Sequence, residues 1–358
     1  MKHCFQLAVP VLLAVACTEG AQRSPTAPEF KSVAATLSAH SISVTSLPSL
    51  GGASTARAIN DNQVIVGTSN GLPVKWTPGA SGQWVVQALQ SSSSGQAQDV
   101  TESGMIVGSS AGSAILWVPG AAPETIGTGI AMAMNESQVV VGVDHSAVDG
   151  SARAWTRSTT GTGWVIHVLP NESGFTGGYS EADDINNDGI IVGMAAPAGG
   201  STYAVKWVKS LTTPGEWDPA VPLDDVAAAN PGGASAILGQ DIVGTVLRCF
   251  PCSTPTRNPY DWSLTAGQGI GSLGTADAWA EGLNAQRSIV GSFYYSGLHA
   301  FVWTVANPTI RELPNPSGYK NGSAYDINSP KFPRTTTQAV GEATSPSGKQ
   351  TAILWTLP

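Results

Sequence analysis

Residues 183–193 read DDINNDGIIVG and carry oxygen-bearing side chains of the kind that bind calcium. The first, third, fifth and sixth places of an EF-hand loop are filled, in this order, by Asp184, Asn186, Asp188 and Gly189. The ninth place is Val192, and the twelfth place, where an EF-hand needs a bidentate Glu, is Ala195. Two interpretations remain open: a calcium site of another type, or a tight turn that uses Asn and Asp for their backbone geometry.

A second reactive arrangement is the C-x-x-C formed by Cys249 and Cys252. A zinc site would need two more ligands nearby, and the chain offers no second pair. A thioredoxin-type motif would begin a helix, which the surrounding VLRCFPCSTPTRNP does not favour. In an oxidising compartment this pair is expected to form a disulfide that pins its loop.

Signals of catalysis are sparse. The chain contains no G-x-S-x-G, no H-E-x-x-H and no Walker loop. Beyond the first 16 residues the histidines are scattered and show no metal-ligand spacing: His40, His145, His167 and His299. We therefore predict no catalytic residues, no metal ligands and no cofactor.

The calcium-like segment is one copy of a repeat. Seven segments each combine an apolar strand, a polar turn and a β-branched strand that ends in Val-Gly. Their final residues are Gly67, Gly108, Gly142, Gly193, Gly244, Gly291 and Gly341. This pattern predicts hairpins, in which Asn and Asp tolerate left-handed turn geometry. Turn chemistry therefore accounts for DDINNDGIIVG better than calcium binding does.

Each hairpin is followed by a short strand that carries a tryptophan. The seven are Trp76, Trp117, Trp155, Trp207, Trp262, Trp303 and Trp355. Three positions earlier, five copies place Ala and two place Pro. A small residue beside a large one is typical of sheet-on-sheet packing, so we expect one tryptophan in each gap between sheets.

A fourth strand follows in most copies, as in IRELP at 310–314. Seven four-stranded units predict an all-β fold, a seven-bladed β-propeller. The last copy stops at Pro358 without a fourth strand, whereas SVTSLP at 43–48 precedes the first copy. We therefore expect the N-terminal strand to complete the last blade and close the ring, which removes exposed sheet edges.

The repeat resembles the bacterial extracellular HAF repeats, named for a His-Ala-Phe tripeptide, over residues 41–358. The segments that match best are SLGGASTARAINDNQVIVG, DDINNDGIIVG and LHAFVWT. One copy keeps the tripeptide, as His299-Ala300-Phe301, and the other copies replace the His. The resemblance implies the fold and a cell-surface location, and little chemistry.

The N-terminus, MKHCFQLAVPVLLAVAC, indicates export, because its apolar stretch suits a signal peptide and is too short to span a bilayer. Its end resembles a bacterial lipobox, which would make Cys17 the lipidated first residue, sorted to the outer membrane or cell surface. Cleavage after Ala16 would instead give a secreted protein. We divide the chain into a signal peptide (1–16), a flexible tether (17–40) and the propeller (41–358).

The charge composition of the chain indicates which classes of partner to expect. The net charge is −8, only 12% of residues are charged, and Lys and Arg form no cluster. Nucleic acid is therefore not expected as a partner. We expect a monomer that reaches the membrane only through its lipid.

The binding face is predicted from loop length, because the loops between second and third strands vary most. Arg and aromatic residues on these loops are typical of binding hot spots, and the candidates are Arg248, Phe250, Arg257, Tyr260, Tyr294 and Tyr295. The alternative is that these aromatics pack the loops onto the propeller. We expect a non-catalytic module that binds a protein or glycan, with a polysaccharide hydrolase or lyase as the alternative and a structural surface protein third.

Overall fold

The computed structural model describes residues 41–358 except 90–92, 147–149, 174–177, 224–230, 249–255, 264–267, 271–276, 332 and 334. The predicted signal peptide, tether and lipidated Cys17 lie outside the described residues, as do Cys249, Phe250 and Cys252. In the described part of the chain, the regular structure is β-strand throughout. No helix there is long and apolar enough to cross a bilayer.

The strands form seven antiparallel sheets of four, here called blades 1 to 7. Blade 1 contains β2 (Ser54–Ile59), β3 (Ile65–Ser69), β4 (Leu72–Pro78) and β5 (Trp84–Ala88). Blade 2 contains β6 (Gly95–Val100), β7 (Ile106–Ser110), β8 (Ser113–Trp117) and β9 (Glu124–Thr128). Blade 3 contains β10 (Ile130–Met134), β11 (Val140–Asp144), β12 (Ser151–Arg157) and β13 (Trp164–Val168). Blade 4 contains β14 (Ser180–Ile185), β15 (Ile191–Ala195), β16 (Tyr203–Trp207) and β17 (Val221–Pro222).

The remaining blades follow the same order, except that the last takes its outer strand from the start of the chain. Blade 5 contains β18 (Gly232–Leu238), β19 (Asp241–Arg248), β20 (Thr256–Asp261) and β21 (Gln268–Gly269). Blade 6 contains β22 (Ala278–Leu283), β23 (Ser288–Tyr294), β24 (Leu298–Thr304) and β25 (Asn307–Glu312). Blade 7 contains β26 (Lys320–Ile327), β27 (Gln338–Thr344), β28 (Gln350–Thr356) and β1 (Ser43–Ser46).

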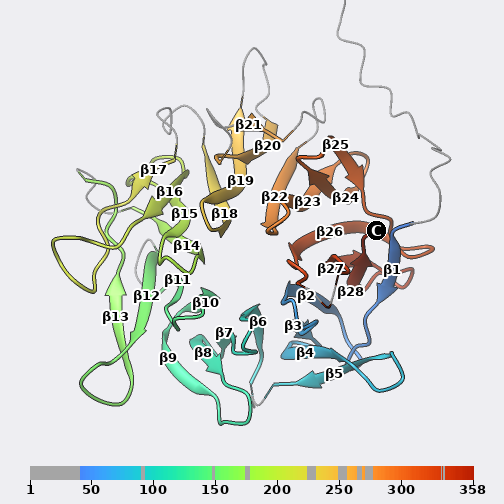
Figure 1. Ribbon diagram of the computed structural model, residues 1–358, viewed down its shortest axis with the longest axis horizontal. Helices are drawn as coiled ribbons and strands as arrows, with labels where there is room; N and C mark the ends of the chain where they lie inside the picture. The colour runs from blue at the N-terminus through green and yellow to red at the C-terminus, as the bar shows by residue number, and fades with distance from the viewer. Residues whose placement is uncertain are drawn as a thin grey trace, which may run out of the picture. The chain divides into compact units, whose positions relative to one another are not determined.

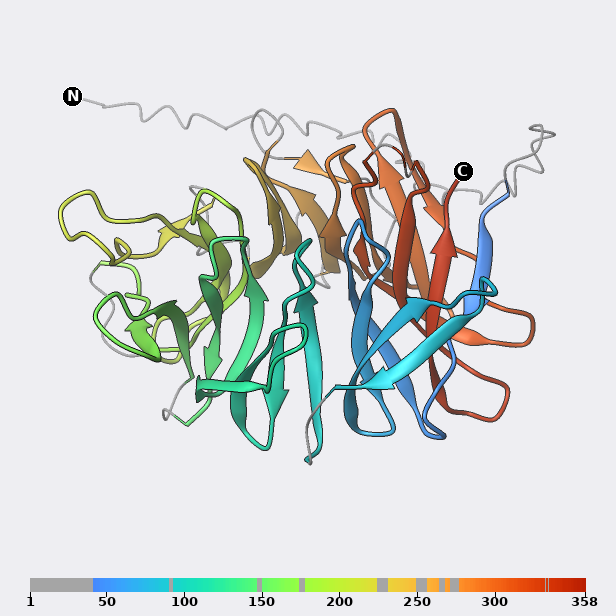
Figure 2. The same cartoon turned by 60° about the horizontal axis from the view of Figure 1, so that its bottom comes forward.

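The blades stand around a common axis, and the first strand of each hairpin repeat lies nearest to it (Figure 1). Figure 2 shows the same ring tilted, with the sheets side by side. The prediction of an all-β, seven-bladed propeller is confirmed. One face carries the turns between first and second strands, and we call it the turn face. The opposite face carries the loops between second and third strands, and we call it the loop face.

The Val-Gly of every repeat has a steric cause. Each of these glycines pairs with an alanine of the inner strand, as Gly67 does with Ala56. A bulge follows that alanine and brings a backbone carbonyl over the glycine, so a Cβ on Gly67 would lie 2.0 Å from the oxygen of Thr55. The other six glycines meet a carbonyl oxygen at 1.9–2.2 Å in the same way. Only glycine therefore fits at the end of the motif.

The Asn of the repeat closes the turn. The side-chain oxygen of Asn60 accepts the backbone N–H of Val64 at 2.9 Å, and Asn135, Asn186 and Asn284 repeat this bond four residues ahead. The fourth turn residue adopts a left-handed backbone, with φ of 62° at Gln63 and 81° at Gly189. Asn and Gly are favoured at these places because they satisfy and tolerate the turn.

The hydrophobic core is divided among the seven gaps between neighbouring blades. Each gap receives one of the predicted tryptophans, and all except the half-buried Trp262 are at most 6% exposed. The five alanines placed three residues before a tryptophan are also buried. The prediction that these tryptophans fill the gaps between sheets is confirmed.

Among the described residues, three gaps show an additional hydrogen bond from the tryptophan. The indole N–H of Trp76 donates to the carbonyl of Pro48 at 2.7 Å, and Trp207 and Trp355 donate in the same way to Pro170 and Pro314. Each proline follows a leucine that is at most 3% exposed: Leu47, Leu169 and Leu313. The Leu-Pro that ends an outer strand thus binds the tryptophan of the next blade.

The first and last blades meet through several contacts. β1 pairs antiparallel with β28, with Val44 opposite Trp355. The backbone N–H of Ala352 donates to Ser54 Oγ at 3.0 Å. These bonds join residues from the two ends of the described chain.

Candidate functional site

The bulges of the inner strands place one residue of each blade on the wall of a central cavity. Register shifts occur at equivalent places in all seven inner strands. The bulged residues are Arg57, Gln98, Met132, Asp183, Ser235, Glu281 and Tyr325. All seven line a cavity of about 500 Å³ that extends to the turn face, here called the turn-side cavity. A bulge redirects a side chain, and here it directs seven toward the axis.

In three blades the residue directly after the bulged one is an aspartate, and its carboxyl group joins neighbouring blades. Each accepts a backbone N–H from the next blade: Asp99 from Met134 at 2.9 Å, Asp184 from Ile237 at 2.7 Å, and Asp326 from Ile59 at 2.8 Å. Burial raises the pKa of Asp99 to about 6 and that of Asp184 and Asp326 to about 7, although the backbone N–H bonds oppose the rise. These aspartates therefore act as connectors between blades.

The same bonds explain the calcium-like motif. Asp184 receives two backbone N–H groups, from Ile237 and from Ile185. Asn186 accepts from Ile190 and donates to the carbonyl of Gly239 at 2.6 Å. Among the described residues, no group of three His, Cys, Asp or Glu side chains is placed to hold a metal ion. The side chains of Asp184 and Asn186 thus bind the protein's own backbone.

Two carboxyls of the ring have a different environment. Asp183 and Glu281 accept no hydrogen bond and no ion pair from the described part of the chain. Burial raises the pKa of Glu281 to about 7, and Arg57 lowers it only in part. Burial, followed by the charges of Glu181, Glu281 and Asp184, holds the pKa of Asp183 well above its usual range. The surroundings of both carboxyls therefore disfavour the ionised form.

A second cavity, of about 410 Å³, opens on the loop face, and we call it the loop-side cavity. It shares four ring residues with the turn-side cavity: Met132, Asp183, Ser235 and Glu281. Its wall adds Met194, Trp279 and Arg257. The two cavities thus meet at the ring of bulged residues, one on each side of it.

Arg257 is held at the edge of the loop-side cavity. Its guanidinium lies 3.4 Å from Asp277 and 5.8 Å from the centroid of the Trp279 ring. Its backbone N–H also donates to Asp277 at 2.7 Å. Since Asp277 balances its charge, Arg257 does not neutralise Asp183 or Glu281.

The six residues predicted to bind a ligand fall into different environments. Arg257 lines the loop-side cavity, and Tyr294 and Tyr295 are 58% and 57% exposed beside the turn from β23 to β24. Tyr260 is 4% exposed and packs edge-on against Trp262, with ring centroids 5.0 Å apart. Of Arg248 the structure gives the backbone, paired with Thr256. Phe250 and the Cys249–Cys252 pair lie outside the described residues. Arg257 therefore lies at a cavity, whereas Tyr260 packs inside blade 5.

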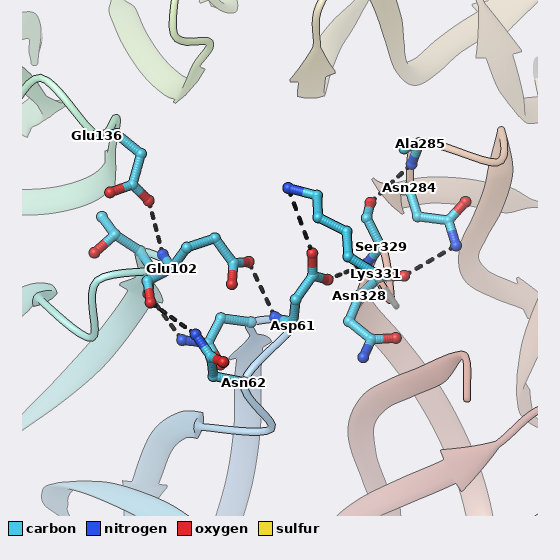
Figure 3. A network of polar contacts seen from close by, with 11 residues as sticks. Asp61, Asn62, Glu102, Glu136, Asn284, Ala285, Asn328, Ser329 and Lys331 are labelled. Atoms are coloured by element: carbon cyan, nitrogen blue, oxygen red, sulfur yellow. Dashed lines mark hydrogen bonds and ion pairs between the residues drawn. The ribbon is translucent and has the colours of Figure 1, made fainter. Parts of the chain in front are cut away.

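The turn face carries a chain of polar contacts between neighbouring turns (Figure 3). The backbone N–H of Asp61 donates to Glu102, that of Glu102 to Glu136, and that of Glu136 to Asn187. The N–H of Ser329 donates to Asp61 at 2.6 Å, which links blade 7 to blade 1. The acidic side chains of this face are thus already engaged in joining the turns.

One group of side chains has the order of a nucleophile, a base and a carboxylate. Thr156 Oγ1 lies 2.9 Å from Nε2 of His167, whose Nδ1 lies 3.1 Å from Glu216 Oε1. His167 is 8% exposed and packs edge-on against Trp217 between blades 3 and 4. None of these residues lines the turn-side or loop-side cavity. Since both ring nitrogens are bonded, the group serves to hold the two blades together.

The sequence contained one signal of the cavity ring. In the repeat A-x-x-I-N, the place after the alanine changes from copy to copy, whereas the alanine is constant across the seven inner strands. A variable position within an otherwise constant repeat is typical of a side chain that does not pack in the core. That signal would have located Asp183 and Glu281.

No protein-family profile and no curated protein sequence matches the chain. Among solved structures, it is similar to a prolyl endopeptidase, with 14% identity and a TM-score of 0.50 over 86% of this chain and 50% of that one. A puromycin-hydrolysing peptidase of Mycobacterium tuberculosis gives 9% identity and a TM-score of 0.47 over 87% and 55%. An α-L-arabinanase of Penicillium chrysogenum gives 11% identity and a TM-score of 0.42 over 86% and 95%. The chain spans about half the length of the two peptidases, and the likeness shows the fold alone.

Proposed function

We propose that this chain is an exported, non-catalytic binding module that recognises a protein or glycan at the loop-side cavity. The observation that carries the proposal is the composition of that cavity. Trp279, Met132 and Met194 line it, all half-buried, and Arg257 lies at its edge. Aromatic, Met and Arg side chains are enriched at binding interfaces, and a concave site removes them from water when a ligand enters.

The turn face is a weaker candidate for binding. Its acidic groups already accept backbone N–H bonds from neighbouring turns. A ligand there would have to compete with bonds that join the blades. Asp183 and Glu281 line both cavities and accept no such bonds. A ligand that reaches them from the loop face does not compete with the contacts between turns, so the proposal places the ligand on the loop face.

The test uses the fragment 41–358, immobilised and exposed to envelope extract and to a glycan array. The affinity of whatever is captured is then measured for Trp279→Ala, Arg257→Ala and, as a control on the turn face, Asn187→Ala. We expect at least a tenfold loss for Trp279→Ala and no change for Asn187→Ala, with thermal melting to show that each variant is folded. Equal losses in all three variants, or none in the first two, would contradict the proposal.

A propeller hydrolase or lyase acting on polysaccharide is the second candidate, and one observation favours it. Burial keeps the pKa of Glu281 at about 7, and a carboxyl that is protonated near neutral pH can serve as a general acid. Release of reducing ends or unsaturated sugars from a polysaccharide panel, lost in Glu281→Gln, would establish this function.

The membrane anchor belongs to the same proposal. The lipobox-like LLAVAC supports lipidation of Cys17 and a place on the outer membrane or cell surface, and the HAF-like repeat supports an extracellular role. Full-length protein and Cys17→Ser are compared by membrane fractionation and intact mass. If both partition with membranes and show the same processed mass, the anchor is not at Cys17.

A further inference from the structure

The loop-side cavity combines an apolar wall with an acidic floor. Met132, Met194 and Trp279 form the wall, and Asp183 and Glu281 come from the ring of bulged residues beneath it. Thioether and indole groups are polarisable and adapt to a long aliphatic chain. A ligand that fits both parts has an apolar stem and a polar end.

The charges of the cavity are unbalanced. Of its described lining residues, three are ionisable: Arg257, Asp183 and Glu281. Arg257 is paired with Asp277, at 3.4 Å between Nη1 and Oδ2. Arg57 is two blades away from Glu281 and lies over the aromatic ring of Tyr325, 4.5 Å from its centroid. Its charge lowers the pKa of Glu281 in part, but it forms no ion pair with Glu281 at 4 Å or less. When they are ionised, the two carboxyls have no hydrogen-bond or ion-pair partner among the described residues, so their negative charge is left unbalanced.

Asp183 and Glu281 are half-buried, so the ionised form of each carboxyl loses part of its solvation without gaining a partner. A cation placed between Asp183 and Glu281 would replace the lost solvation with direct attraction. A neutral hydroxyl group would supply a hydrogen bond and leave the charge. Charge complementarity thus favours a cationic ligand at this floor.

We propose, on the basis of the binding function above, that the ligand is a polypeptide that inserts a lysine or arginine side chain into the loop-side cavity. The methylene stem packs between Met132, Met194 and the Trp279 ring, which also attracts the cation through its face. The ammonium or guanidinium group then binds Asp183 and Glu281. Both parts of the side chain are matched, which neither a purely apolar nor a purely anionic group achieves.

The experiment titrates fragment 41–358 with capped pentapeptides of Gly that carry one central residue, followed by NMR or tryptophan fluorescence. The central residue is Lys, Arg, Nε-acetyl-lysine or norleucine, and a chitosan oligomer serves as a cationic glycan. We expect the Lys and Arg peptides to bind at least tenfold more tightly than the acetyl-lysine and norleucine peptides. Acetylation is decisive because it keeps the stem and removes the charge.

The variants locate the site. The double variant Asp183→Asn, Glu281→Gln should weaken binding of the Lys peptide at least fivefold. Asp188→Asn, which removes a carboxyl lining the turn-side cavity, should leave it unchanged. Thermal melting checks that each variant is folded.

The remaining outcomes are distinct. Equal binding of Lys and acetyl-lysine peptides, binding of chitosan without binding of peptides, or no peptide binding at millimolar concentration overturns the basic-side-chain proposal. In those cases the binding function itself survives if a captured ligand is still lost in Trp279→Ala. If no captured ligand depends on Trp279, the proposed function fails as well.

Discussion

Seven tryptophans occupy equivalent places, and their indole N–H groups have unequal partners. Trp76, Trp207 and Trp355 donate to a proline carbonyl of the preceding blade. The indole nitrogens of Trp155, Trp262 and Trp303 are buried without a partner among the described residues. If only buried area mattered, substitutions at these positions would cost similar stability. A difference in stability between them should therefore report the contribution of the hydrogen bond.

The first prediction compares Trp355→Phe with Trp155→Phe. Both side chains are 0% exposed, so each change removes a similar area from the core. Trp355→Phe also removes the hydrogen bond to the carbonyl of Pro314, and such a bond contributes about 0.5–1.5 kcal/mol to stability. Chemical denaturation should therefore show a larger loss of unfolding free energy for Trp355→Phe. Equal losses would mean that the indole bond contributes nothing.

The second prediction concerns pH. The pKa values of Asp184, Asp326 and Glu281 rise to about 7 in the folded chain, from 3.8 or 4.5. The folded state then binds more protons than the unfolded state between about pH 4 and 7, so these groups lower the free energy of unfolding as pH rises through that range.

Glu281→Gln removes one such group while keeping its shape. We compare the difference in melting temperature, Glu281→Gln minus wild type, at two pH values. This difference should be larger at pH 8 than at pH 4.5, because the wild-type carboxyl is protonated at pH 4.5. Asp218→Asn, which changes an exposed carboxyl with no hydrogen bond or ion pair among the described residues, serves as the control for loss of a surface charge. A Glu281→Gln difference that is independent of pH would show that this carboxyl has an ordinary pKa.

At the scale of elements, the hairpin is the unit that the sequence describes well. The apolar strands, the Asn and Gly turns and the tryptophan strands were all predictable, because each leaves a local pattern. The bulge was not, because one extra residue in a strand looks like ordinary alternation until the partner strand is in place. The ring of seven bulged residues, which includes Asp183 and Glu281, depends on that bulge. The variable place after the alanine marks these positions in the sequence, but nothing local shows that they face one cavity.

The candidate binding residues also show what local sequence could not predict. Arg257 and Tyr260 are three residues apart on one strand, and both were expected to face a ligand. Three places along a strand put side chains on opposite faces, so Arg257 reaches a cavity and Tyr260 packs against Trp262. Which face meets the neighbouring blade is set by the assembled ring, not by local sequence.

The third prediction tests why each repeat ends in glycine. A Cβ on Gly193 would lie 2.1 Å from the carbonyl oxygen of Glu181, so Gly193→Ala must displace the bulge. Such overpacking costs about 1–3 kcal/mol. Gly161→Ala is the matched control, because nothing lies within 4 Å of its Cβ. A similar stability for both variants would remove the steric account of the motif.

At the scale of the whole molecule, the first and last blades contact each other through residues from the two ends of the described chain. β1 pairs with β28, Leu47 is 3% exposed, and Pro48 binds the indole of Trp76. The turns add the bond from Ser329 to Asp61. Removing residues 43–48 would thus take away an outer strand, a core side chain and a tryptophan acceptor together.

The fourth prediction follows from this. A chain beginning at residue 49 should unfold at a much lower temperature than one beginning at residue 41, or aggregate through the exposed edge of β28. Calorimetry and light scattering on the two fragments provide the comparison. If they melt at the same temperature with the same cooperativity, β1 is dispensable for closing the ring.

The most direct measurement of the central claim is hydrogen–deuterium exchange on fragment 41–358 with and without its captured ligand. The account predicts that backbone amides around Met194, Thr245, Arg257 and Trp279, next to the loop-side cavity, become protected on binding. Amides of the turns at 60–63 and 135–138 should exchange at unchanged rates. Protection confined to those turns or to the outer strands, with none near the loop-side cavity, would contradict the account.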